Sequence, residues 1–361
     1  MLTRARPTPV PLADGGRELA SRLGRAALAA IWAANSPGIS ERFIAPEHRT
    51  QLSRTWFRTA DGWELPLWRR APRPDADGAP VLLAVGPALL PQCLTLGGEG
   101  ALVSQLHRAG MDVYLLSHRG DPEARPPAQS RQFDFDDLVA HDLHAAIQAI
   151  RSRTRAERLM FIGHGIGGLL FVAHMARGGR EDLATGVTIC APVSFEATGT
   201  RARELQRVAR MLPAGWHIPH RALQRFLLAT GRDRALRTLA HQVDGPTLRR
   251  VALDNTVDLS AGLVRQIARW HSAGHLCDRD DRFDDIAALT GTPFPLLAVT
   301  GDADPVCSLE ASAPLVRALD GAESHHLSGG WGHLDPLVGT AAAAHVCPRV
   351  IDWLRDGRQR C

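Results

Sequence analysis

A glycine-dense stretch in the middle of the chain has the spacing of a catalytic turn. Residues 159–170 read Leu-Met-Phe-Ile-Gly-His-Gly-Ile-Gly-Gly-Leu-Leu. This spacing matches G-x-S-x-G, in which a sharp strand-to-helix turn presents a serine hydroxyl to an acyl carbon. Gly165 occupies the place of the serine. Because glycine has no side chain, formation of an acyl-serine intermediate at this position is excluded.

The elements that must position this turn follow from hydrophobic patterning. Residues 159–162 predict the strand that enters it, and the continuous apolar run at 81–85 predicts a neighbouring strand that is buried on both faces. The pattern predicts further strands at 112–117 and 187–191 and helices at 101–109 and 135–152. Strands that alternate with helices indicate an α/β fold, a mostly parallel central sheet flanked by helices.

The alternation is interrupted once, after residue 195. Between 196 and 275 the chain shows helical patterns at 205–212, 222–228 and 263–270 and no persuasive strand. A strand at 294–300, a helix at 309–319, a short strand at 325–327 and a final helix at 346–354 follow. We therefore predict a core of residues 50–195 and 280–361 with an inserted helical cap at 196–279. Residues 1–49 predict an N-terminal arm and an amphipathic helix packed on the body.

This arrangement resembles the α/β-hydrolase superfamily over about residues 50–358, and locally its esterase/lipase and polyhydroxyalkanoate-synthase members. Their nucleophile, acid and histidine follow one another in that order along the chain. Gly301-Asp302-Ala303-Asp304-Pro305 is similar to the turn that carries the acid, with Asp304 at its place. Gly330-Trp331-Gly332-His333-Leu334-Asp335 is similar to the loop that carries the histidine, with His333 at its place. The resemblance implies that the acid and base remain without a nucleophile.

The resemblance also implies an oxyanion hole built from two backbone N–H groups. Ile166 matches the first donor. In the second loop, Val85 and Gly86 match the usual His-Gly pair and Pro87 the donor, although proline has no N–H. A register slip of one residue would give this role to Ala88. Loss of one such donor costs about 10²–10³ in rate. Both the nucleophile position (Gly165) and the donor position (Pro87) therefore depart from the hydrolytic pattern. Two departures favour a natural loss of acyl transfer over a single substitution of the serine.

Other side chains could act in place of the serine. His164 lies beside Gly165, but a structural role is favoured over a catalytic one. Cys93 could serve as a displaced nucleophile, although a buried and inert thiol is the favoured interpretation. His325 and His326 alternate on a predicted strand without a carboxylate or cysteine at ligand spacing, so we predict no metal site there.

Composition bounds the function classes. The 361 residues are 45% hydrophobic and 22% charged, which is typical of a globular protein. The net charge of +4 is the excess of 42 arginines over 38 acidic residues. The absence of lysine, together with abundant Ala, Gly and Pro, indicates a GC-rich bacterial coding bias. The arginines are spread among acids and there is one tyrosine, so the pattern argues against nucleic-acid binding.

The cysteines and apolar runs point to an intracellular protein. The six cysteines are scattered without a C-x-x-C pair, so neither a zinc site nor a disulfide framework is predicted. The apolar run at 26–34 is too short for a membrane span, and no convincing signal-peptide cleavage region follows. We therefore expect a cytoplasmic protein without a transmembrane segment. No cofactor is predicted, and the oligomeric state stays open.

Three hypotheses for the function remain. In the first, the chain is an enzyme that uses the His333–Asp304 pair for acid–base chemistry on a mainly apolar, carbonyl-containing small molecule. In the second, it is an inactive descendant that binds a ligand or a partner with the old cleft. In the third, it is a conventional ester hydrolase whose serine has been mutated. Retention of the acid and the histidine favours the first hypothesis over the second.

Overall fold

The computed structural model describes residues 52–128, 132–195, 207, 209–213, 215–231 and 234–359. The predicted N-terminal arm and amphipathic helix at 1–49 lie outside the described residues. The predicted helix at 205–212 lies partly outside them, and the described positions from 207 to 211 are helical.

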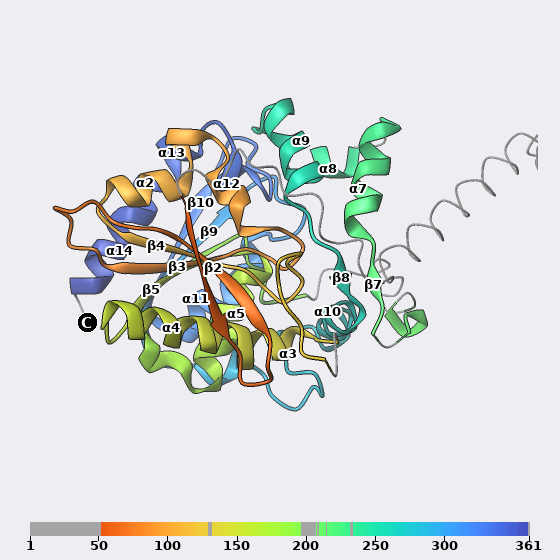
Figure 1. The fold of residues 1–361 in the computed structure, drawn as a ribbon, viewed down its shortest axis with the longest axis horizontal. Helices are drawn as coiled ribbons and strands as arrows, with labels where there is room; N and C mark the ends of the chain where they lie inside the picture. Colours follow the sequence, from red (N-terminus) through yellow and green to blue (C-terminus); the bar gives the residue numbers. More distant parts are fainter. Residues whose placement is uncertain are drawn as a thin grey trace, which may run out of the picture.

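A mostly parallel sheet of eight strands forms the centre of the described residues (Figure 1). In spatial order its strands are β1 (Ser53–Arg58), β2 (Glu64–Arg70), β4 (Asp112–Leu116), β3 (Pro80–Ala84), β5 (Leu159–His164), β6 (Leu183–Ile189), β9 (Thr292–Gly301) and β10 (Leu319–Leu327). β1 pairs antiparallel with β2, and β2 with β4, whereas all other neighbours pair in parallel. The predicted α/β fold class is confirmed.

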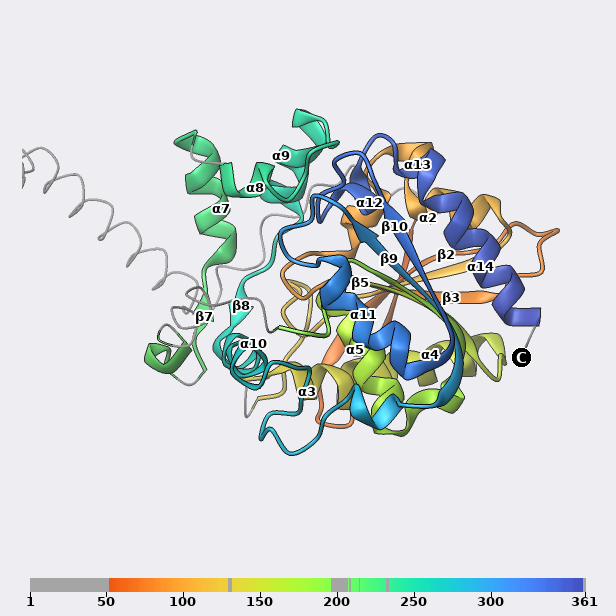
Figure 2. The ribbon, with the colours of Figure 1, turned by 180° about the vertical axis from the view of Figure 1, so that it is seen from behind.

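Two hydrophobic cores lie on opposite faces of the sheet because successive strand residues point to opposite sides. Val81 and Leu83 belong to one core, and Leu82 and Ala84 to the other. The first core is covered by α2 (Leu102–Arg108), α12 (Asp335–Val338), α13 (Ala342–His345) and α14 (Cys347–Gln359). The second is covered by α3 (Phe135–Asp137), α4 (His144–Thr154), α5 (Ile166–His174) and α11 (Leu309–Ala318). Figure 2 shows α14 and α11 on either side of the sheet.

The predicted helix at 135–152 is not a continuous α-helix. α3 runs into a π-helical stretch, Leu138–Leu143, before α4 begins. Asp134 caps the start, because its side chain accepts the N–H of Asp137 while the Asp137 side chain accepts that of Asp134. β1 and β2 form a hairpin, and its turn contains Asp61-Gly62.

The segment between β6 and β9 lies to one side of the sheet (Figure 1). It contains α7 (His220–Ala229), α8 (Arg234–Arg237), α9 (Gly245–Asp254) and α10 (Ala261–Ala273). The expectation of no strand here was wrong in one detail, since β7 (His217–Ile218) and β8 (Leu259–Ser260) form a short antiparallel ladder. Two-residue strands are too short to produce an alternating pattern, so the sequence carried no signal for them.

The described part of the chain contains no candidate transmembrane helix. None of its helices combines the length and hydrophobicity that a transmembrane span requires.

Candidate active site

Gly165 forms the turn between β5 and α5. Its backbone has φ +53° and ψ −124°, a conformation that side-chain-bearing residues rarely adopt. The Gly165 N–H donates to the carbonyl of Ile189 at 2.9 Å, and its own carbonyl accepts the N–H of Gly168 at 3.0 Å. A Cβ at Gly167 would lie 2.2 Å from the Ala84 carbonyl oxygen. The glycines therefore allow both the turn and the close approach of α5 to β3.

His333 and Asp304 form a hydrogen-bonded pair, although 28 residues separate them in the sequence. Asp304 follows β9, and His333 lies in the loop that precedes α12. Nδ1 of His333 lies 2.9 Å from Oδ2 of Asp304. Since a carboxylate accepts, Nδ1 carries the proton, and Nε2 of a neutral ring keeps its lone pair. The pair has the orientation that a general base requires.

The surroundings of Asp304 keep its carboxylate ionised. Burial opposes ionisation, but the hydrogen bond and charge of His333 and the N–H of Val306 together hold the Asp304 pKa below its usual range. Oδ1 accepts the N–H groups of Val306 at 2.7 Å and Cys307 at 3.0 Å. Cys190, which the sequence analysis did not single out, also hydrogen-bonds this carboxylate through its buried thiol. No spacing signal links Cys190 to Asp304, because the contact is tertiary.

Nε2 of His333 faces the space above Gly165. A Cβ added at Gly165 would lie 3.3 Å from Nε2 and 3.6 Å from Cε1 of that ring. The histidine therefore stands where it would contact a side chain at position 165. With glycine there, this space is open to a water molecule or a substrate atom.

His164 fixes the backbone of His333. Its Nε2 lies 2.9 Å from the His333 carbonyl oxygen, so Nε2 must be the donor. Burial and the nearby His333 lower the pKa of His164 to about 3, which keeps this ring neutral. The two rings lie 4.6 Å apart between centroids. The contact fits the predicted structural role, in which His164 joins the turn to the histidine loop.

In the loop after β3, some residues line the cavity above Gly165 and others are buried away from it. Gly86 and Ala88 line the cavity above the turn. Val85 is fully buried, and its carbonyl accepts the Nε2 proton of His118 at 2.9 Å. Pro87 is buried and is not among the residues that line this cavity. Ala88 N–H has no acceptor among the described residues, so the loop can offer a donor only in the slipped register.

A cavity of about 710 Å³ lies over Gly165, between the carboxyl ends of the strands and helices α7, α9 and α10. His333 and Asp304 line it from the core. Its apolar walls include Leu169 of α5, Val251 of α9 and Ile267 of α10. The arrangement can hold an apolar small molecule with its reactive group at His333.

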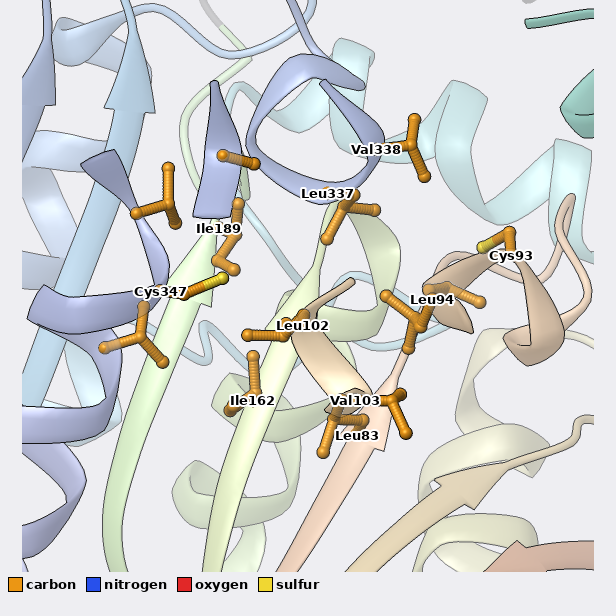
Figure 3. Packing of buried hydrophobic residues seen from close by; sticks show 14 of the residues in the cluster. Leu83, Cys93, Leu94, Leu102, Val103, Ile162, Ile189, Leu337, Val338 and Cys347 are labelled. Atoms are coloured by element: carbon orange, nitrogen blue, oxygen red, sulfur yellow. The ribbon is translucent and has the colours of Figure 1, made fainter. Parts of the chain in front are cut away.

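Three other candidates lie away from the cavity. Cys93 is packed in the first core near Leu94 (Figure 3), and burial raises its pKa to about 12. His325 and His326 lie on the edge strand β10, where the His326 ring meets the Thr300 hydroxyl at 3.0 Å. The structure therefore brings neither the thiol nor these two rings to the predicted active site.

A metal ion at the pair would compete with its hydrogen bonds. Donor atoms of His164, Cys190 and His333 lie within 4.8 Å of one another. However, the Cys190 thiol hydrogen-bonds the Asp304 carboxylate that orients His333, and an ion bound at this sulfur would displace that hydrogen bond. These contacts favour an acid–base pair over a metal centre.

The chain belongs to the α/β-hydrolase family described as serine aminopeptidase, S33, whose sequence model matches residues 97–333. It is 25% identical over 128 residues to poly(3-hydroxyalkanoate) polymerase subunit PhaC of Haloarcula marismortui. That alignment covers 36% of this chain and spans 26% of the relative's length. The resemblance predicted from the sequence is confirmed.

Solved structures share the fold at low sequence identity. An esterase from Exiguobacterium antarcticum has a TM-score of 0.60 and 16% identity, with 84% of this chain and 100% of that chain covered. A bromoperoxidase from Bacillus anthracis has a TM-score of 0.59 and 15% identity, with 84% and 100% covered. At these identities the similarity shows the fold alone.

Proposed function

We propose that this chain is an α/β-hydrolase-fold enzyme in which His333, oriented by Asp304, acts as the general base and acid without a covalent nucleophile. The observation that carries the proposal is the intact 2.9 Å His333–Asp304 hydrogen bond beneath an apolar cavity, with Nε2 directed at a side-chain-free position 165. A binding protein has no need of a buried ionised carboxylate paired to a histidine.

The proposed reaction begins with proton transfer to Nε2 of His333. The proton comes either from a water molecule in the space above Gly165, which then attacks the carbonyl, or from a carbon beside that carbonyl. The imidazolium that forms is stabilised by the Asp304 carboxylate, whose lowered pKa keeps it ionised. His333 then returns the proton to the leaving group or to the product carbon.

The carbonyl oxygen of the substrate would lie at the start of α5. Ile166 N–H is one of the groups at a helix N-terminus that have no intrahelical partner. The Ala88 N–H of the facing loop, which also lines the cavity, would be the second donor. This assignment is the slipped register, since Pro87 supplies no N–H.

The substrate is proposed to be mainly apolar and small. The cavity volume of about 710 Å³ lies in the range of small-molecule pockets, and its walls are mostly hydrocarbon. Helices α7, α9 and α10, which lie within the proposed cap, supply one side of the cavity. We propose that this cap, residues 196–279, selects the substrate.

Incubation with a panel of apolar esters and ketones tests the proposal. Reactions in deuterated water report C–H exchange by NMR, and reactions in ¹⁸O-labelled water report direct attack by mass spectrometry. The His333→Ala and Asp304→Asn variants are expected to lose about 10²–10⁴ of the rate, whereas His326→Ala, an exposed histidine on β10, is the control. Binding without turnover, or unchanged turnover in His333→Ala, would contradict the proposal.

A further inference from the structure

The chain returns from the helical segment to the core through a loop that follows α10. The N–H of Phe195, where the chain leaves the core, donates to the carbonyl of Gly274 at 3.0 Å. Ser194 and His275 form an antiparallel bridge beside it. The segment that leaves the core and the segment that returns to it are therefore paired through residues 194–195 and 274–275. We call this region, together with the loop up to residue 284, the neck.

Three side chains with metal-ligating atoms converge where the chain returns to the core, and the Asp284 carboxylate lies beside one of them, His275. Donor atoms of His275, Cys277 and Asp281 lie within 4.8 Å of one another. Nε2 of His275 is 3.8 Å from an oxygen of Asp281 and 3.9 Å from Oδ2 of Asp284. A tetrahedral zinc ion with bonds of 2.0–2.3 Å has ligands about 3.3–3.8 Å apart. The three donors of His275, Cys277 and Asp281 lie at a spacing close to this, and Asp284 approaches from the His275 side as the fourth donor.

The orientation of His275 leaves its Nε2 available to a metal ion. Its Nδ1 lies 3.1 Å from the carbonyl oxygen of Ala273, and a carbonyl only accepts, so Nδ1 carries the proton. In the neutral ring the lone pair of Nε2 then faces the carboxylates of Asp281 and Asp284. Histidine ligands of metal ions commonly donate their other N–H to a backbone carbonyl in this way.

The remaining ligands are held in place by contacts outside the cluster. Oδ1 of Asp284 accepts the N–H groups of Ile286 and Ala287 at 2.9 Å each, which leaves Oδ2 toward His275. The carbonyl of Cys277 accepts the indole N–H of Trp270 at 2.9 Å. Cys277 is fully buried, with its sulfur close to Asp281. The donors are thus largely ordered before an ion binds.

Within the part of the chain that the structure describes, no arginine is ion-paired with Asp281 or Asp284. The Arg279 guanidinium is paired with Asp134, Asp136 and Asp137. Because metal ions bind cysteine as the thiolate, zinc binding at Cys277 is expected to release a proton to solvent.

We propose that the neck binds one zinc ion through Nε2 of His275, Sγ of Cys277 and the carboxylates of Asp281 and Asp284. Nitrogen, sulfur and oxygen ligands together suit Zn²⁺, whereas Mg²⁺ and Ca²⁺ prefer oxygen alone. All four positions are filled by protein, so the ion is structural. The ion would fix the loop at residues 275–284 next to Trp270, a residue that also lines the cavity.

Zinc titration of chelator-treated protein by calorimetry, together with cobalt absorption spectra, tests this proposal. We expect one zinc per chain, release of protons on binding, and a zinc-dependent rise in Tm. Asp281→Asn should weaken binding at least tenfold, because it removes a charged ligand. Asparagine tolerates the left-handed backbone at Asp281 (φ +58°), so the fold should persist. Asp280→Asn, at the exposed neighbouring position, is the matched control.

Cobalt spectra assign the sulfur. The thiolate-to-cobalt charge-transfer band should disappear in Cys277→Ser and persist in Cys190→Ser. No zinc binding in the wild-type protein overturns the proposal, as does equal affinity in Asp281→Asn. Loss of the band only in Cys190→Ser also overturns it, because the ion would then lie near His164 and His333. None of these readouts depends on turnover, so failure of the proposed function leaves them interpretable.

Discussion

Gly165 combines two consequences of having no side chain. It adopts a backbone conformation with positive φ at no steric cost, and it leaves the Nε2 atom of His333 facing open space. A turn of the same shape with a side chain would bring that side chain against His333. Glycine thus permits the strand-to-helix turn and supplies no side-chain nucleophile at position 165.

Gly165→Ser should therefore create an ester hydrolase. The serine Cβ would lie 3.3 Å from Nε2 of His333, within reach of a hydrogen bond from the new hydroxyl. The positive φ is expected to cost about 1–2 kcal/mol of stability. Hydrolysis of a short-chain p-nitrophenyl ester measures the gain, and Gly165→Ala controls for the added Cβ. A folded serine variant no more active than the alanine variant would count against this geometry.

Buried neutral histidine makes stability depend on pH. The pKa of His164 is lowered to about 3 in the folded chain, against about 6.5 when unfolded. Between these values the unfolded chain binds a proton that the native chain does not, so stability falls as pH drops from about 6.5 toward 3. His118, with a pKa lowered to about 4, acts in the same direction.

His164→Gln should flatten part of this dependence. Glutamine can still donate to the His333 carbonyl but does not titrate. Urea unfolding at several pH values between 4 and 7 measures the slope, and His326→Gln at an exposed position is the control. An unchanged slope in His164→Gln would show that His164 is not buried in its neutral form.

At the scale of elements, buried ion pairs fix the relative positions of segments that hydrophobic packing alone would not hold in one arrangement. Arg119, in the loop after β4, donates to Asp142 of the π-helical stretch at 2.8 Å and to Asp61 of the β1–β2 turn at 2.7 Å. The side chains of Arg119 and Asp142 are 1% and 0% exposed. The loop after β4, the π-helical stretch and the β1–β2 turn therefore share one charge network.

Arg119→Met should destabilise the protein by about 3–5 kcal/mol, because Asp142 would remain buried without its cation. Arg158→Met is the control, since Arg158 and Glu181 form an exposed pair worth about 0–1 kcal/mol. Denaturant unfolding measures both changes. Equal losses in the two variants would mean that the Arg119 network contributes no more than a surface pair.

At the scale of the whole molecule, the cavity exists only because two parts of the chain meet. Its floor is formed by the ends of strands, with Asp304 and His333, and one wall is formed by α10. Phe195 packs on Trp270 at the neck, with ring centroids 5.6 Å apart. The position of α10 therefore sets the size of the space in which His333 can act.

Ile267→Trp should fill part of this cavity and lower both apolar-ligand binding and turnover at least tenfold. Ile267 faces the cavity from α10, whereas Arg269 on the same helix is exposed. Arg269→Trp, which adds the same side chain outside the cavity, is the matched control. Calorimetry with a medium-chain fatty acid measures the binding. Comparable affinity in both variants would show that ligands bind elsewhere.

The sequence by itself determined the α/β class, the strand-to-helix turn at Gly165 and the candidacy of Asp304 and His333, because these depend on local periodicity and short motifs. It did not reveal the β7–β8 ladder or the π-helical stretch, which leave no distinct period. Only the tertiary structure decided that His164 holds the His333 backbone, that Cys190 contacts Asp304, and that His275, Cys277 and Asp281 converge with Asp284 beside His275. Such contacts depend on the direction of side chains in three dimensions, which the spacing of residues along the chain does not specify.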